Sequence, residues 1–455
     1  MKSRILLLSL FSLIEFVLVH FFLIQRFANS GDEAAFLYQG RMFSHGQLYV
    51  EDPIYDRAHP LNKFIRADAL DDLNGRRFAK YDPGWAMLLA LGTLAHAEGI
   101  VAPLLGALTV FLLLTYVRKR IGEEYVWPMW WLVTLCSFFC LSVANFGSHT
   151  ATMAILVGVF LIYDTFEDSP WWLFGAGLLL GYTSLIRYLD WMPMMAWIGF
   201  DLLRKRRIKG IILIALGFGL IASGHLLYNT LITGNAFLPP AVHDARGNEQ
   251  ARIGVWSGAF AVTGIRLFRV LYTFPPALLL LVCLFRRCQS ARLKIYLGLF
   301  FCNVCLYVVY AWTPAGPGPR YYFTYFPFLF LAVIEVYRLT RTEKIGRTGW
   351  RVAIVCLVLC SIGYASVQAL EIYRRRDLER TVATIPEKQK VILLESGTYK
   401  MELPDLVRNP LDLWGADTLY VDYRDRTGIA ELLKRFPGHA VYRYRYPGSL
   451  KPWKE

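Results

Sequence analysis

The sequence has 455 residues, of which 55% are hydrophobic and only 18% are charged, and its mean hydropathy is +0.37. Soluble domains carry about 25% charged residues, so these values exclude a disordered chain, a collagen-like repeat and an ordinary soluble enzyme. The 49 basic and 35 acidic residues give a net charge of +14. We assign this excess to the cytoplasmic ends of membrane helices and expect no nucleic-acid partner.

Apolar stretches follow one another along most of the chain. The first, 5–24, comes after Lys2 and Arg4 and is long enough to cross a bilayer, which needs about 20 residues. We interpret it as an uncleaved anchor rather than a signal peptide, with the N-terminus in the cytoplasm. A polar outer loop, 26–83, follows. The next apolar piece, 84–97, would extend only about 21 Å as a helix, which indicates a re-entrant or interfacial segment.

Ten further spans bring the predicted total to about eleven transmembrane helices. They are expected at roughly 100–117, 126–144, 149–165, 171–187, 190–203, 210–231, 269–285, 293–311, 321–337 and 351–370. The fold class is therefore an all-α polytopic membrane bundle, and residues 1–370 form its membrane domain.

Basic residues are concentrated in alternate loops. Four short loops, near 118–120, 204–209, 286–294 and 338–351, hold 17 of them, whereas the short turns on the other side hold only Arg187 and Arg320. Positive charge marks the cytoplasmic side. The C-terminus is therefore expected outside.

The tail, 371–455, is a separate segment on that outer side. Short apolar runs predict strands at 391–395 and 418–423, and the alternation of arginine with tyrosine predicts a third at 441–446. A helix is expected at 428–436, between the last two strands. This order predicts a small extracytoplasmic α/β domain.

The outer loop holds the most informative polar residues. Asp32 and Glu33 lie just beyond the first span, where two acids can serve as a general base or metal ligands, or can simply cap a helix. Lys80 and Asp82 precede a Pro-Gly break. Lys80 would lie at headgroup height, where it can bind a lipid phosphate or merely extend to the surface.

Other turns on the same side carry further candidates. His149 and Asn229 can contact a substrate or pair with neighbouring helices. Arg187 ends an uncharged span and either binds an anion or forms an ion pair with Asp190.

A Gly-Pro-Gly-Pro turn precedes Arg320 and Tyr321, which suits phosphate binding because arginine can hold two oxygens at once. No nucleotide-binding motif appears in a soluble context. A reaction on the outer side would therefore need an activated substrate that is delivered in the lipid.

Several of these segments together resemble the C-type membrane glycosyltransferases, close to the protein O-mannosyltransferases and the lipid A aminoarabinose transferases. The resemblance rests on the order and spacing of short motifs, over roughly 1–370. The motifs are Gly31-Asp32-Glu33, Gly46-Gln47-Leu48-Tyr49, Lys80-Tyr81-Asp82-Pro83-Gly84-Trp85, Ser148-His149-Thr150, Asn229 with Thr233-Gly234-Asn235, and Gly318-Pro319-Arg320-Tyr321.

The resemblance implies an inverting transfer of a sugar from a polyprenyl phosphate to an acceptor hydroxyl, outside the bacterial inner membrane. The resemblance assigns the role of general base to Asp32, with Glu33 as second choice. It assigns binding of the lipid phosphate to Lys80 and Arg320. Many relatives have a second proline where this chain has Asp82, so the role of that acid is open. The acceptor, whether glycan, lipid or protein, is not implied.

Two other functions stay open. A transporter or flippase of a lipid-linked sugar would bind the same phosphate without chemistry, and a non-catalytic membrane scaffold would need none of these side chains to act together. No cofactor is required by the sequence, although Asp32, Glu33 and Asp82 could gather around a divalent cation.

Overall fold

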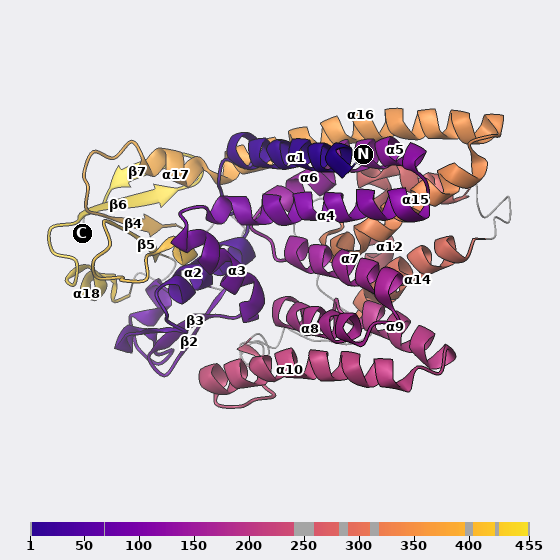
Figure 1. Ribbon diagram of the computed structural model, residues 1–455. Helices are drawn as coiled ribbons and strands as arrows, with labels where there is room; N and C mark the ends of the chain where they lie inside the picture. Colours follow the sequence, from indigo (N-terminus) through magenta and orange to yellow (C-terminus); the bar gives the residue numbers. More distant parts are fainter. Residues whose placement is uncertain are drawn as a thin grey trace. The chain divides into compact units, whose positions relative to one another are not determined.

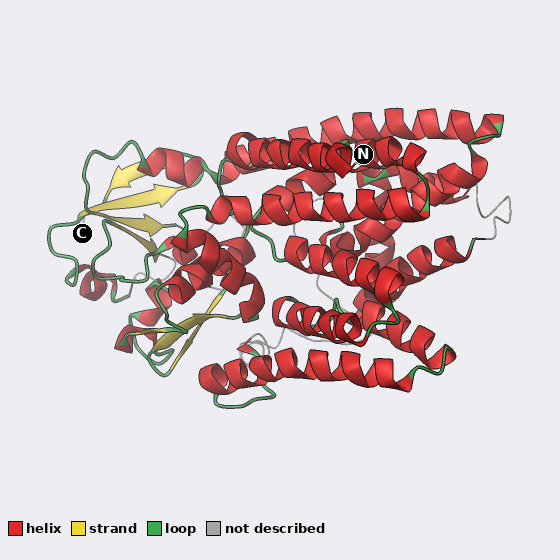
Figure 2. Cartoon of the chain, viewed as in Figure 1, coloured by secondary structure: helices red, strands yellow, loops and turns green. Residues whose placement is uncertain are grey.

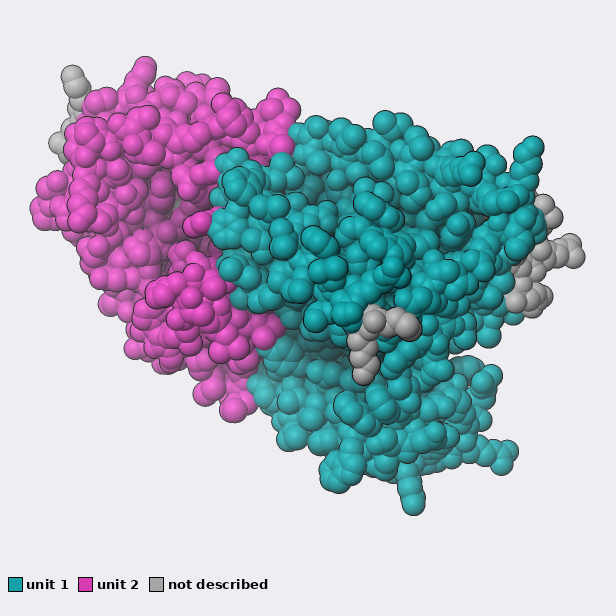
Figure 3. All heavy atoms as spheres, turned by 45° about the horizontal axis from the view of Figure 1, so that its top comes forward, with its two compact units in different colours: residues 1–25, 99–226, 248–368 teal, residues 26–98, 227–247, 369–455 magenta. Residues whose placement is uncertain are grey.

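The computed structural model describes residues 2–67, 69–240, 259–281, 290–309, 318–395, 404–423 and 427–453 (Figure 1). Contacts divide the chain into two compact units (Figure 3). Unit 1 comprises 1–25, 99–226 and 248–368, and unit 2 comprises 26–98, 227–247 and 369–455. Unit 1 is helical in its described part, and both sheets belong to unit 2 (Figure 2). This grouping by contacts cuts the chain differently from the division at residue 370, which stays a prediction.

Six helices in the described residues are long and apolar enough to cross a membrane, or eight if two bent pairs each count as one span. The expected total of about eleven spans is therefore not confirmed. Three of the expected spans form shorter helices: α8 (Pro170–Ile186), α9 (Met192–Arg204) and α14 (Ala291–Leu306). The six long segments are Ser3–Leu23, within α1 (Lys2–Leu18) and a π-helical turn, α4 (Glu98–Arg120), α7 (His149–Phe166), α10 (Ile208–Thr233), Arg320–Thr340, which includes α15 (Phe326–Thr340), and Gly346–Arg375, within α16 (Lys344–Arg375).

The span expected at 269–285 is wrong in its bounds. Helix α12 runs from Ala259 to Thr273, and the chain then bends by 108° into the segment Pro275–Leu281. Two consecutive prolines explain the break, because they lack amide donors and exclude the helical conformation from the residue before them. The span expected at 126–144 is likewise two helices, α5 (Val126–Thr134) and α6 (Ser137–Ala144), bent by 69°.

Helices α8 and α10 of unit 1 pack at very short range through glycine. A Cβ atom on Gly177 would lie 2.3 Å from the carbonyl oxygen of Ile214, and one on Gly217 would lie 2.4 Å from the carbonyl oxygen of Phe174. Small residues let membrane helices approach closely enough for extensive backbone contact. The pairing of these two helices therefore depends on the absence of side chains at the contact.

The first half of unit 2 joins two helices to a small antiparallel sheet. In the sequence, helix α2 (Gly31–Ser44) precedes and helix α3 (Pro83–Leu94) follows strands β1 (Val50–Glu51), β2 (Leu70–Leu73) and β3 (Arg76–Ala79). The strands pair in the order β1-β3-β2. Asn74 and Gly75, both with positive φ, form the two-residue turn between β2 and β3. Such turns match the twist of the strands that they join.

The second half of unit 2 is a four-stranded sheet in the order β5-β4-β6-β7. Strand β4 (Lys390–Leu394) pairs in parallel with β5 (Thr418–Asp422) and β6 (Ala440–Arg445), and β7 (Ser449–Pro452) is antiparallel to β6. The expected strands are confirmed within one residue at either end. The expected helix at 428–436 is the shorter α18 (Ile429–Leu433). Helix α17 (Asp377–Val382) precedes the sheet.

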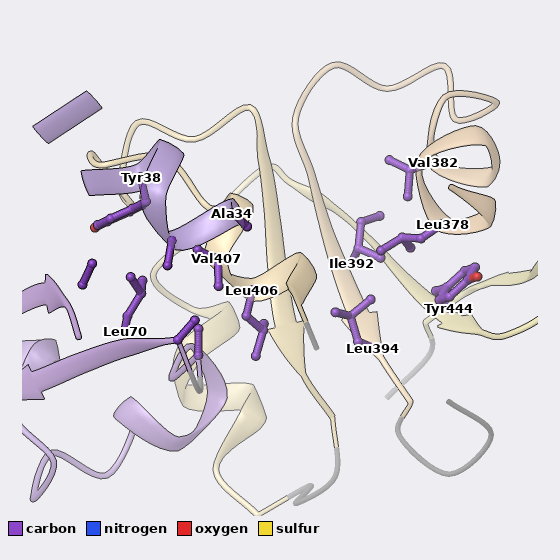
Figure 4. Close-up of a cluster of buried hydrophobic side chains, with 14 of the residues drawn as sticks. Ala34, Tyr38, Leu70, Leu378, Val382, Ile392, Leu394, Leu406, Val407 and Tyr444 are labelled. Carbon is purple, nitrogen blue, oxygen red and sulfur yellow. The ribbon is translucent and has the colours of Figure 1, made fainter. Parts of the chain in front are cut away.

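Strand β4 is buried on both faces, as its continuous apolar sequence requires. Ile392 and Leu394 face a core that contains Ala34 and Tyr38 of α2 together with Leu378 of α17 (Figure 4). The alternate residues of β4, Val391 and Leu393, face a second core with residues of the segment 54–65 and of α18. Residues near the N-terminus and the C-terminal sheet thus form shared cores within one unit.

A buried ion pair joins strands β2 and β3 of the first sheet, where Asp72 and Arg77 are opposite each other in the register. Arg77 donates to both carboxylate oxygens of Asp72, at 2.6 and 2.8 Å, and its guanidinium lies 4.1 Å from the ring centroid of Tyr55. Asn62 donates to the same carboxylate at 2.8 Å. Buried charges are tolerated when they are paired and hydrogen-bonded in this way.

The glycine contact gives a prediction with opposite signs at neighbouring positions. Gly177→Ala should lower the free energy of unfolding by about 1–3 kcal/mol, because its methyl group would overlap backbone atoms. The loss should appear as a lower thermal midpoint of the full-length protein in detergent. Gly175→Ala, in the same helix but with no atom within 4 Å of its Cβ, should be neutral or stabilising by up to about 1 kcal/mol. Equal effects of the two substitutions would contradict the proposed close packing.

Candidate active site

The N-terminus of α2 separates the roles of the two adjacent acids. Ser30 caps the helix by accepting from the Glu33 amide at 3.2 Å, and the Glu33 carboxylate accepts from the Asn29 amide at 3.0 Å. This is close to a reciprocal capping box, with the acid reaching one residue further back. Arg375 of α16 donates to the Asn29 carbonyl and fixes the same turn. The cap interpretation therefore applies to Glu33.

Asp32 instead faces the segment that precedes α3. The hydroxyl of Tyr81 donates to the Asp32 carboxylate, and the Tyr81 ring packs on Phe36 with centroids 4.7 Å apart. Two turns beyond Asp32 along the helix, the Gln39 side chain donates to the Tyr81 carbonyl at 3.2 Å and to the Tyr228 hydroxyl at 2.9 Å. The acid predicted to be the base is thus held by a partner 49 residues away in the sequence.

Three other predicted residues, Lys80, Asp82 and Asn229, also belong to unit 2. Lys80 precedes Tyr81 directly and follows strand β3, whereas the buried Asp82 is the N-cap residue of α3 and its charge acts on Tyr228. Asn229 donates to the Ala236 carbonyl at 3.0 Å and so closes the turn that follows α10. Asn229 therefore has a structural role in addition to any contact with substrate.

In unit 1, Arg187 forms the ion pair that the sequence left as an alternative. Its Nε donates to Asp190 at 2.6 Å, its Nη2 donates to the Tyr307 hydroxyl at 2.8 Å, and Tyr307 in turn donates to Asp190. Tyr325 donates to the Asp190 carbonyl at 2.7 Å. Arg187 is therefore held in a closed network of hydrogen bonds, with the Asp190 carboxylate fully buried.

A second arginine cluster of unit 1 centres on Tyr321. The guanidinium groups of Arg320 and Arg266 lie 5.3 and 5.0 Å from the Tyr321 ring centroid, within the range of cation–π contacts. The same ring stacks on Tyr307 at 5.2 Å. His149, at the first turn of α7, is close enough to Arg187 and Arg320 for their charges to act on it. Gly316 and Pro317 of the predicted Gly/Pro turn lie outside the described residues.

Arg266 is a member of this cluster that sequence reasoning missed. Its side chain is buried, with one nitrogen donating to the Tyr307 carbonyl at 2.7 Å. The signal was an arginine inside a helix of a membrane protein, which is costly without a role. The expected span began at residue 269, so Arg266 fell into a loop.

The predicted residues thus gather in two sets. Unit 2 carries Asp32, Tyr81 and Asp82 with the preceding Lys80, and unit 1 carries two networks of arginine and tyrosine that share Tyr307. Among the described residues no group of three or more His, Cys, Asp or Glu side chains could hold a metal ion. The gathering of Asp32, Glu33 and Asp82 that the sequence left open is therefore not seen among these residues.

The fold matches solved structures although the sequence matches little. No protein-family model and no curated protein matches the sequence. ArnT from Cupriavidus metallidurans aligns with 97% of this chain over 93% of its own, with a TM-score of 0.58 bound to undecaprenyl phosphate and 0.57 in the apo state, at 11% identity. ArnT is a lipid A aminoarabinose transferase. The resemblance seen in the sequence is therefore confirmed at the level of the fold, and the chain is a multi-pass membrane protein with an ArnT-like fold.

The Arg187–Asp190 network predicts strong coupling. Asp190→Asn and Arg187→Gln should each lower the thermal midpoint, because breaking a buried pair costs about 3–5 kcal/mol, and the double variant should lose less than the sum. Asp168→Asn is the control, since its pair with Arg207 is exposed and worth less than about 1 kcal/mol. Strictly additive losses at 187 and 190 would show that the two groups do not depend on each other.

Proposed function

We propose that the protein is a membrane glycosyltransferase that moves a sugar from a polyprenyl-phosphate donor to an acceptor hydroxyl on the extracytoplasmic side. The likeness of its fold to ArnT, a structure of which holds undecaprenyl phosphate, supports this class of reaction. The observation that carries the proposal is the hydrogen-bonded pair of Asp32 and Tyr81, with Lys80 next in sequence. A carboxylate oriented by a fixed donor suits a base that must meet an acceptor at a set angle.

In this mechanism Asp32 takes the proton of the acceptor hydroxyl. The acceptor oxygen then bonds to the anomeric carbon from the face opposite the phosphate, so the configuration inverts. The bond from that carbon to the phosphate oxygen breaks, and its electron pair leaves with the polyprenyl phosphate. Tyr81 keeps the Asp32 carboxylate in one orientation throughout.

Negative charge grows on the departing phosphate, and fixed positive charge stabilises it most in the transition state. We assign this role to Lys80 and Arg320, with Tyr321 orienting Arg320 through the contact of its ring. Arg187 already donates to Asp190 and Tyr307. We therefore give Arg187 a supporting role, and we give His149, Asn229 and Asp82 contacts with the substrate.

The orientation belongs to the same proposal. The basic loops put the N-terminus in the cytoplasm and residues 371–455 outside a bacterial inner membrane. Cytosolic nucleotide sugars do not reach that side, which is why a lipid-linked donor is needed.

The test compares the two adjacent acids in the full-length protein. Asp32→Asn should reduce transfer by about 10²–10⁴-fold, the usual contribution of a positioned base. Glu33→Gln should keep transfer within about tenfold, because a glutamine oxygen can still accept from the Asn29 amide. The measurement is release of free polyprenyl phosphate from a labelled polyprenyl-phosphate sugar, with envelope lipid and glycan fractions as acceptors.

The opposite pattern would assign the base to Glu33. Binding of the labelled donor without release of polyprenyl phosphate from any fraction would instead favour the transporter or flippase. A thermal midpoint for Asp32→Asn equal to that of the unmodified protein is the control for folding.

A further inference from the structure

Unit 2 contains a cavity of about 560 Å³ that the proposed chemistry does not use. Its walls come from two segments far apart in the sequence, 38–55 and 409–414, and every lining residue belongs to unit 2. This volume lies within the range of about 300–1,000 Å³ that is usual for small-molecule sites.

The cavity lies on a different face of α2 from Asp32. Tyr38 and Arg41 line it from successive turns of the helix, and so does His45, the residue that caps the C-terminus of α2. Asp32 and Gln39 face the other way, toward Tyr81. One helix therefore presents the candidate base on one face and this cavity on the other.

The loop at 409–414 is held firmly against the sheet. Asn409 donates to the Tyr420 carbonyl at 2.9 Å and accepts from the Tyr420 amide at 2.8 Å, so both ends of its amide are fixed to β5. Asp412 accepts from the amides of Trp414 and Gly415 at 3.1 and 3.2 Å. The cavity wall is therefore preorganised by these hydrogen bonds.

Trp414 supplies a fixed aromatic surface at the cavity. Its indole nitrogen donates to Asp52, and its ring stacks on Phe436 with centroids 5.4 Å apart. The Trp414 side chain is still 37% exposed. A large ring that is fixed yet accessible offers contact area to a ligand at little entropic cost.

The buried hydroxyl of Tyr38 indicates that a ligand of this cavity would carry polar groups. The residue is only 3% exposed, and among the described residues its hydroxyl has no hydrogen-bond partner. Burial raises the pKa of Tyr38, so the group stays protonated and can donate. Figure 4 shows its oxygen end directed away from Leu406 and Val407. Leaving such a group unsatisfied costs about 1–3 kcal/mol, which a bound hydroxyl would recover.

We propose that this cavity binds a neutral saccharide. The part of the Trp414 ring that Phe436 and Arg435 leave exposed suits the apolar face of a sugar. The Tyr38 hydroxyl, the carboxylates of Asp52 and Asp412, and Arg41 suit its hydroxyl groups.

Three carboxylates line the cavity against Arg41 and His45, which disfavours an anion. Each carboxylate already has a partner, because Glu51 pairs with Arg76, Asp52 accepts from the Trp414 indole, and Asp412 accepts from two backbone amides. A neutral ligand therefore suits the cavity better than a cation. Binding here needs no transfer reaction and goes beyond the proposed function, for which this site would hold a glycan acceptor.

The test measures binding to the full-length protein in nanodiscs by saturation-transfer NMR and titration calorimetry. The probes are the methyl glycosides of glucose, galactose, mannose and N-acetylglucosamine and their disaccharides. We expect at least one probe to bind saturably. Tyr38→Phe should weaken that probe by about 3–10-fold, the effect of one hydrogen bond, and Trp414→Ala by at least about tenfold.

Matched controls lie elsewhere in the same unit. Tyr442→Phe removes an exposed hydroxyl that donates to Glu387 at 2.9 Å and should leave saccharide binding unchanged. Binding is measured without any polyprenyl-phosphate sugar, so it succeeds or fails independently of transfer. Absence of saturable binding by every probe, or equal affinities in Tyr38→Phe, Trp414→Ala and the unmodified protein, would overturn the proposal.

Discussion

Helix α2 has close neighbours on two faces, and the features of unit 2 that bear on function depend on that packing. On one face a Cβ atom at Gly40 would lie 3.0 Å from the Leu89 Cβ of α3, so only a glycine allows this approach without a shift. On the other face, Ala34 and Ala35 pack into the core that includes β4. Small residues on both sides fix the rotation of the helix about its axis. The direction of Asp32 toward Tyr81 follows from that rotation.

Buried carboxylates in both units are compensated by arginine. Asp72 of unit 2 and Asp190 of unit 1 each accept from an arginine side chain, which offsets the loss of water and fixes the local backbone. Asp32 accepts from the Tyr81 hydroxyl, and this contact limits the orientations open to its carboxylate. A fixed orientation is what the proposed role of Asp32 as a base requires.

Short sequence patterns predict single strands and helix ends, but they do not predict which distant segments come into contact. Strands β4 and β5 follow from short apolar runs and β6 from the alternation of tyrosine with arginine, and the position of Asp32 and Glu33 just beyond the first span allowed a helix cap. Arg266 was missed because its charge lowers the hydropathy of the window that holds it. The Tyr81–Asp32 pair and the cavity between 38–55 and 409–414 were out of reach, since no local periodicity encodes contacts across 49 residues or more.

Recognition of an acceptor poses a different physical problem from recognition of the donor. A polyprenyl phosphate can be selected by its charge and its solubility in the bilayer, and arginine or lysine side chains respond to the phosphate whatever sugar it carries. An acceptor in water has neither property, and one sugar differs from another only in the positions of its hydroxyl groups. Discrimination on that scale requires buried polar groups that stay unsatisfied with the wrong ligand. The Tyr38 hydroxyl, which lines the same cavity of unit 2 as Trp414, meets that requirement. In the proposed function, selectivity for the acceptor therefore arises on a different face of α2 from Asp32.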